Sequence, residues 1–73
     1  MKRKIYAIAK KHNVEILSYK SQRSDMGVQM FEMTLKNQNG DVWIHDDGYY
    51  VGEKNGREKI LEYFEQDLSG RTN

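Results

Sequence analysis

His45, Asp46 and Asp47 stand in a row and form the one cluster of metal-ligating residue types in the chain. On a strand, His45 and Asp47 would share a face, with Glu32 opposite or nearby on a neighbouring strand. An imidazole and two carboxylates can bind a divalent ion. The same residues followed by Gly48 are also typical of a tight turn, which Asp side chains favour. We favour the turn, and we predict no metal site and no cofactor.

Other catalytic chemistry lacks the residues that it needs. The chain has no cysteine, which excludes thiolate zinc sites, cysteine nucleophiles and disulfides. Its serines lie in polar segments without a nearby His–Asp arrangement, and the segment 52–56 lacks the Lys-Ser/Thr ending of a phosphate-binding loop. We therefore expect no enzymatic activity.

Length and composition predict one small domain. The chain has 73 residues, and its apolar runs are far too short to span a membrane. The basic start at residues 1–4 has no apolar stretch behind it, so a signal peptide is not expected. These features predict a single domain over residues 1–70, a loose tail over 71–73, a cytoplasmic location and no membrane partner.

Hydrophobic periodicity and turn residues predict two helices and three or four strands. We expect helices over 1–12 and 55–70, and strands over 14–19, 28–36, 41–45 and 49–51. Asn37-Gln38-Asn39-Gly40 is typical of a hairpin, and Asp46-Asp47-Gly48 of a second turn. The expected fold class is α+β, a two-layer α-β-β-β(-β)-α arrangement with an antiparallel sheet and both helices packed on one face.

Two helices cover only one face of such a sheet, so the hairpin register decides which side chains remain exposed. A four-residue or a two-residue loop gives the same assignment, because sliding a partner by two residues keeps each side chain on its face. The residues predicted to point inward are Phe31, Met33, Leu35, Val42 and Ile44. Those predicted to point outward are Glu32, Thr34, Trp43 and His45.

The single tryptophan is therefore expected on the open face. A two-residue turn at Asp47-Gly48 places Tyr50 beside it, and a three-residue turn places Tyr49 there instead. The predicted partner-binding residues are Trp43, His45, Tyr50, Tyr49, Thr34 and Glu32. Exposed aromatic residues also serve cross-strand pairing, and the loop over 18–29 is an alternative cover for Trp43.

Our first hypothesis from these residues is a small non-catalytic protein-interaction domain. Trp and Tyr are enriched in binding hot spots, which favours a regulator or inhibitor that docks on a larger protein. Homodimer formation through the same face or through the edge of the sheet is a variant of this hypothesis.

Charge is distributed unevenly and supports a second hypothesis, nucleic-acid binding. Residues 1–23 carry seven basic and one acidic side chain, whereas residues 24–73 carry five basic and ten acidic ones. Basic side chains on the first helix would contact phosphates. The predicted nucleic-acid-binding residues are Lys2, Arg3, Lys4, Lys10, Lys11 and Arg57.

The order of the elements resembles that of the double-stranded-RNA-binding domain. Ile5-Tyr6-Ala7-Ile8-Ala9 is similar to the first helix of that family, and Phe31-Glu32-Met33-Thr34-Leu35 to its second strand. The resemblance implies double-stranded RNA as the ligand of the alternative function. The family carries a lysine cluster at the start of its second helix, whereas this chain has Asn55-Gly56-Arg57-Glu58-Lys59 there.

Overall fold

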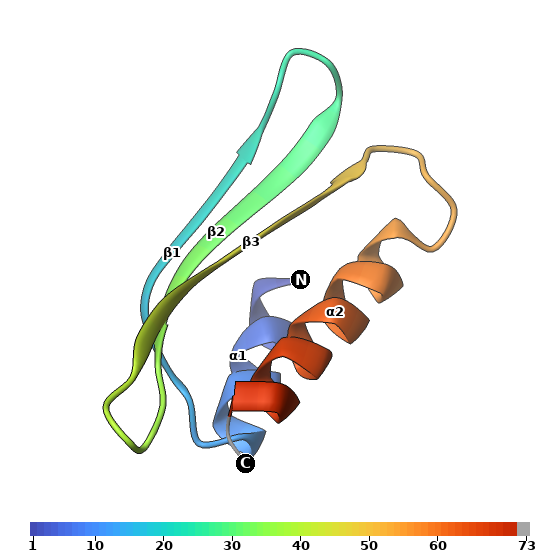
Figure 1. Cartoon of the computed structure of the whole chain (residues 1–73). Helices are drawn as coiled ribbons and strands as arrows, with labels where there is room; N and C mark the ends of the chain where they lie inside the picture. The colour runs from blue at the N-terminus through green and yellow to red at the C-terminus, as the bar shows by residue number, and fades with distance from the viewer. Residues whose placement is uncertain (72–73) are drawn as a thin grey trace.

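The computed structural model describes residues 1–71, and it has two helices and three strands. In chain order they are α1 (Lys2–Lys11), β1 (Glu15–Arg23), β2 (Val28–Lys36), β3 (Val42–Tyr50) and α2 (Gly56–Arg71). The strands form one antiparallel sheet in the order β1-β2-β3. The predicted α+β class is confirmed, with both helices on the same side of the sheet (Figure 1).

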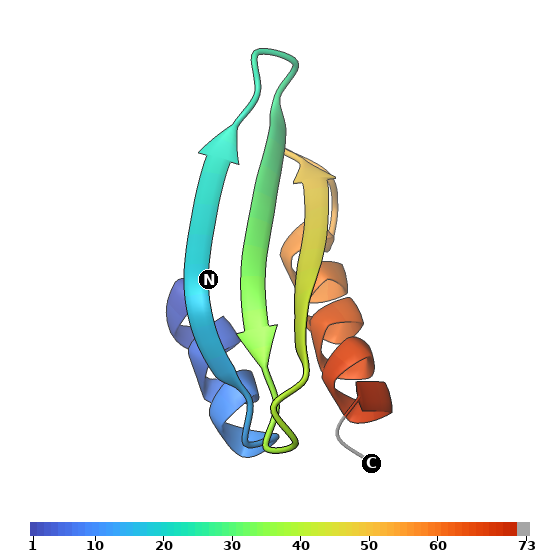
Figure 2. The same cartoon turned by 60° about the vertical axis from the view of Figure 1, so that its left-hand side comes forward.

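The two faces of the sheet have different surroundings. Both helices lie behind the sheet in Figure 2, and the face turned to the viewer has no layer over it. We call the face that contacts the helices the inner face, and the opposite one the open face. Among residues 1–71, no helix is long and apolar enough to cross a membrane.

The core lies between the inner face and the two helices. Ile5 and Ala9 are buried one helical turn apart on α1, and the spacing of four residues recurs on α2. There the buried apolar side chains are Ile60, Phe64 and Leu68. The middle strand contributes alternate residues, Phe31, Met33 and Leu35. The helical spacing of four residues places one stripe of each helix against the sheet, and the alternation along β2 places one face of that strand against the helices.

The loop of the hairpin between β2 and β3 has neither of the two predicted lengths, four or two residues. Lys36 pairs with Val42, so the loop has five residues, from Asn37 to Asp41. The buried Asn37 organises this loop, because its Oδ1 accepts hydrogen bonds from the backbone N–H groups of Asn39 and Asp41, both at 3.0 Å. Gly40 adopts a positive φ of 87°, which glycine tolerates at no steric cost.

An odd loop length reverses the face assignment of β3, because successive side chains on a strand alternate. Leu35 pairs with Trp43 and Met33 pairs with His45. The predicted inward orientation of Val42 and Ile44 is therefore wrong, as is the predicted outward orientation of Trp43 and His45.

Other predicted elements and boundaries also differ from the structure. Residues 46–48 form no turn, because β3 continues to Tyr50, and the fourth strand over 49–51 is absent from the described chain. β1 extends to Arg23, beyond the predicted end at residue 19. α2 continues through Gly70, and Arg71 belongs to the helix, with its Nε donating to Asp67 Oδ1 at 2.9 Å. The other two residues of the predicted tail, Thr72 and Asn73, lie outside the described residues.

Candidate functional site

Trp43 belongs to the packing between sheet and helix. Its Nε1–H donates a hydrogen bond to Asp67 Oδ2 on α2 at 2.9 Å. The Arg71 guanidinium lies over the indole ring, 4.8 Å from the ring centroid. The side chain therefore packs against the core and is half-buried, so it does not belong to the open face.

His45 lies next to Trp43 on the inner face and shares the same acceptor. Its Nδ1 is 3.1 Å from Asp67 Oδ2, and its ring contacts Phe64 edge-on at a centroid distance of 5.3 Å. Burial alone would raise the pKa of Asp67, but hydrogen bonds from Arg71 and Trp43 and the nearby His45 outweigh burial and lower that pKa. Asp67 is thus an anionic anchor that joins α2 to β3.

The residues considered for a metal site are on two different faces. Asp47 lies on the inner face, with Oδ2 3.6 Å from His45 Nε2. Glu32 lies on the open face, because side chains alternate along β2 and its neighbours Phe31 and Met33 are buried on the inner face. Among residues 1–71, no group of three or more His, Cys, Asp or Glu side chains is arranged to hold a metal ion.

The open face carries a different set of side chains from the one predicted. Tyr50, Thr34 and Glu32 are on it as expected, whereas Tyr49 is on the inner face, where its ring stacks on Phe31 at 6.3 Å. Four apolar side chains from β2 and β3 are exposed there: Met30 (46%), Val42 (56%), Ile44 (60%) and Tyr50 (64%). The sheet thus presents aliphatic and phenolic surface to solvent.

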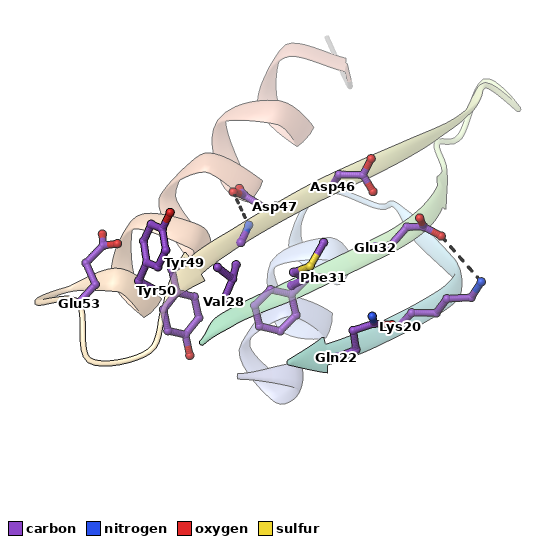
Figure 3. A pocket seen from close by; sticks show the side chains of 12 residues that line it. Lys20, Gln22, Val28, Phe31, Glu32, Asp46, Asp47, Tyr49, Tyr50 and Glu53 are labelled. Atoms are coloured by element: carbon purple, nitrogen blue, oxygen red, sulfur yellow. Dashed lines mark hydrogen bonds and ion pairs between the residues drawn. The ribbon is translucent and has the colours of Figure 1, made fainter. Parts of the chain in front are cut away.

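A hollow of about 750 Å³ lies at the β1–β2 loop end of the sheet and opens on this face (Figure 3). Gly48 contributes no side chain to it, and Met30 and Tyr50 line it. We call this hollow, with its lining residues, the Gly48 groove. The glycine also allows the strands to pack closely, since a Cβ at Gly48 would lie 3.1 Å from the Gln29 carbonyl oxygen.

Carboxylates predominate around the Gly48 groove. Four acidic residues line it, against one basic residue, Lys20: Glu32, Asp46, Asp47 and Glu53. Lys20 Nζ is 3.8 Å from Glu32 Oε1, and Figure 3 shows this pair reaching across the strands. Asp46 forms no ion pair within residues 1–71. The groove therefore combines an apolar floor with a negatively charged border.

The residues predicted to bind nucleic acid do not all line one cavity. Lys11 Nζ pairs with Glu65 Oε1 on α2 at 3.1 Å. Lys4 and Lys10 are exposed on α1, and neither lines the cavity that Arg57 lines. These three lysines of α1 therefore do not line the same cavity as Arg57.

The other members of that set lie nearer to one another. Lys2 and Arg57 line a common cavity, together with Arg23 from β1. Arg3 lines a small hollow with Lys2 and Tyr6. Basic side chains thus meet at the N-terminal end of α1, and one of them, Arg23, was not among the predicted residues.

Four residues that are important for the two faces were not predicted as site residues. Asp67 contacts the inner face, and the open face carries Met30, Ile44 and Asp46. The alternation along β3 is regular, so its pattern identifies both faces once the loop length is known. The faces of β3 were predicted wrongly because the five-residue length of the β2–β3 loop was not recognised. Asn37 could have indicated this loop, because the side chain of an Asn that starts a hairpin loop can accept hydrogen bonds from backbone N–H groups further along the loop.

Comparison of the chain with protein-family models, with curated proteins and with solved structures finds no match.

Proposed function

We propose that this chain is a small protein-interaction domain that docks through the open face of its sheet. The partner is a protein segment that inserts apolar side chains into the Gly48 groove and places lysine or arginine side chains along its border. The observation that carries this proposal is the groove itself, with Met30 and Tyr50 inside it and Glu32, Asp46 and Glu53 around it.

The apolar part of the groove supports a protein ligand. Tyr50 and Met30 are exposed by 64% and 46% although they lie on a regular sheet. Tyr and Met are enriched in the cores of protein interfaces, and the flexible Met side chain adapts to different partners. Ile44 extends this apolar surface along β3 and is 60% exposed.

The border of the groove selects the charge of the partner. Its carboxylates outnumber its single lysine. Lys20 pairs with Glu32 and Lys59 pairs with Glu53, so within residues 1–71 Asp46 is the border carboxylate that forms no ion pair. Complementary charge accelerates association and disfavours partners of like charge. A second copy of this chain would bring carboxylates against carboxylates in this region, so a basic segment of another protein is favoured over self-association.

Selection from a random peptide library on the immobilised chain tests this proposal. We expect the selected peptides to carry apolar residues flanked by Lys or Arg. Reversing one border charge with Asp46→Lys should weaken their binding about tenfold or more, since each 1.4 kcal/mol corresponds to a factor of ten. Binding is measured by calorimetry, and sedimentation of the free chain reports self-association.

Two matched controls accompany the groove variants. Glu62→Lys makes the same charge change on an exposed position of α2. Met30→Thr removes an apolar side chain from the groove, and Met26→Thr removes the same side chain from an 85% exposed position outside it. Equal losses in the groove variants and in their controls, or a dimer that blocks the groove, would contradict the proposal.

A further inference from the structure

A second cavity, of about 380 Å³, lies on the inner face beyond the first turn of α1. A ten-residue helix is about 15 Å long, whereas a nine-residue strand spans about 30 Å. α1 therefore covers only part of the sheet, and Figure 1 shows the strands extending past its N-terminus. Residues from all three strands, from α1 and from the start of α2 line the space that remains.

Three cations from three different elements converge on this cavity. They are Lys2 of α1, Arg23 of β1 and Arg57 of α2. Within residues 1–71, no acidic residue lines it and none of the three cations forms an ion pair. The cavity is thus positively charged, in contrast to the acidic Gly48 groove on the other face.

Aromatic rings form the floor of the cavity. Tyr19, Phe31 and Tyr49 follow one another across the sheet with centroid distances of 6.3 Å at each step. Burial and the nearby Tyr6 raise the pKa of Tyr19, so its hydroxyl is neutral near pH 7 and adds no negative charge. Phe31 is 5% exposed, so the cavity offers its cationic groups together with the rings of Tyr19 and Tyr49 to one ligand.

Contacts already present hold two of the cations in place. Arg57 Nε donates to the Tyr49 hydroxyl at 3.3 Å, and Lys2 Nζ lies 5.4 Å from the Tyr19 ring centroid. Gly56 allows the first of these contacts, because a Cβ there would lie 2.7 Å from Tyr49 Cδ2. The start of α2 thus approaches the Tyr49 ring closely enough to place Arg57 at the cavity.

We propose that this cavity binds a nucleotide, with the phosphate held by Lys2, Arg23 and Arg57 and the base against the aromatic floor. Arginine binds phosphate through charge-assisted hydrogen bonds, and bases stack on aromatic side chains. The volume lies within the range of about 300–1,000 Å³ that is typical of small-molecule sites. The nucleotide is either free or one unit of a single strand. The linings of this cavity and of the Gly48 groove share Phe31 and Tyr49, but the basic side chains of the cavity do not line the groove.

Titration of the ¹⁵N-labelled chain with adenosine monophosphate tests the proposal by NMR. We expect shifts of the Lys2, Arg23 and Arg57 amides. Adenosine and inorganic phosphate should each bind about tenfold more weakly, because each makes only part of the contacts. An eight-nucleotide single strand distinguishes the two sources: tighter binding than the mononucleotide at the same amides indicates a strand, and weaker binding a free nucleotide.

Arg57→Gln and Lys2→Gln should each weaken binding of the mononucleotide about tenfold. Lys10→Gln removes the same charge from an exposed position of α1 outside the cavity and should change binding less than about twofold. Equal losses in Lys2→Gln and Lys10→Gln, equal affinity for adenosine and its monophosphate, or no shifts at these amides would overturn the proposal. Failure here leaves the peptide selection on the other face unaffected.

Discussion

Replacing Trp43 by Ala is expected to lower the free energy of unfolding by about 3 kcal/mol, because large aromatic residues that pack against a core cost this much to truncate. The substitution removes the indole from between sheet and helix, together with its hydrogen bond to Asp67 and its contact with Arg71. A loss of this size is a large fraction of the stability of a 73-residue domain. Urea unfolding followed by circular dichroism measures it, since the variant has no tryptophan fluorescence.

A second variant at Trp43 separates the contributions to this loss, and a variant on the open face is the control. Trp43→Phe keeps a ring under Arg71 but removes the N–H donor, and it should cost about 1 kcal/mol. Tyr50→Thr on the open face should change stability by less than about 0.5 kcal/mol, because the side chain is 64% exposed. A Trp43→Ala variant as stable as the parent chain would show that Trp43 lies on the open face.

Replacing Asp67 by Asn is expected to lower the free energy of unfolding by about 2 kcal/mol at pH 7, because charge-assisted hydrogen bonds contribute more than neutral ones. Asp67 lies within hydrogen-bond distance of Trp43, His45 and Arg71, and its side chain is only 23% exposed. The hydrogen bonds outweigh the effect of burial and lower the pKa of Asp67 below its ordinary value. Urea unfolding of the parent chain and the variant over a series of pH values measures the difference.

The lowered pKa fixes the direction of the pH dependence. The stabilisation by ionised Asp67 is fully present above the ordinary pKa of about 3.9, and it is lost as the pH falls through the lower pKa of the folded state. Hydrogen bonds from Lys11 and His12 also lower the pKa of Glu65, so the parent chain and the variant share that part of the acid loss. The difference in stability between them should therefore shrink below about pH 4. A difference that stays constant down to about pH 2 would contradict this role of Asp67.

Much of the fold was predictable because it depends on local patterns. The stripe of Ile5 and Ala9, the end of α1 near Asn13, and the alternation of Phe31, Met33 and Leu35 each arise from the period of one element. The boundaries of β2 agree with the prediction at both ends. The end of α2 was less predictable, because Gly70 permits a helix to end without requiring it.

The candidate site was only partly predictable, because it depends on the length of one loop. Thr34 and Glu32 were placed correctly, since their face is fixed by their buried neighbours on β2. Trp43 and His45 were placed on the wrong face, because the Asn-Gly pair suggested a loop of two or four residues. The side chain of Asn37 instead closes a loop of five, and its Nδ2 also donates to the Arg71 carbonyl oxygen on α2 at 3.2 Å. That contact joins residues far apart in the sequence, so no local pattern contains it.

The docking proposal is tested most directly by an isotope-filtered NOE spectrum of the ¹³C-labelled chain bound to one selected unlabelled peptide. Met30 and Ile44 carry methyl groups on the open face, and Ile8 and Leu61 carry them on the helices, partly buried against the core. We predict NOEs from the apolar residues of the peptide to the Met30 and Ile44 methyl groups. NOEs to the Ile8 or Leu61 methyl groups, with none to Met30 or Ile44, would contradict docking through the open face.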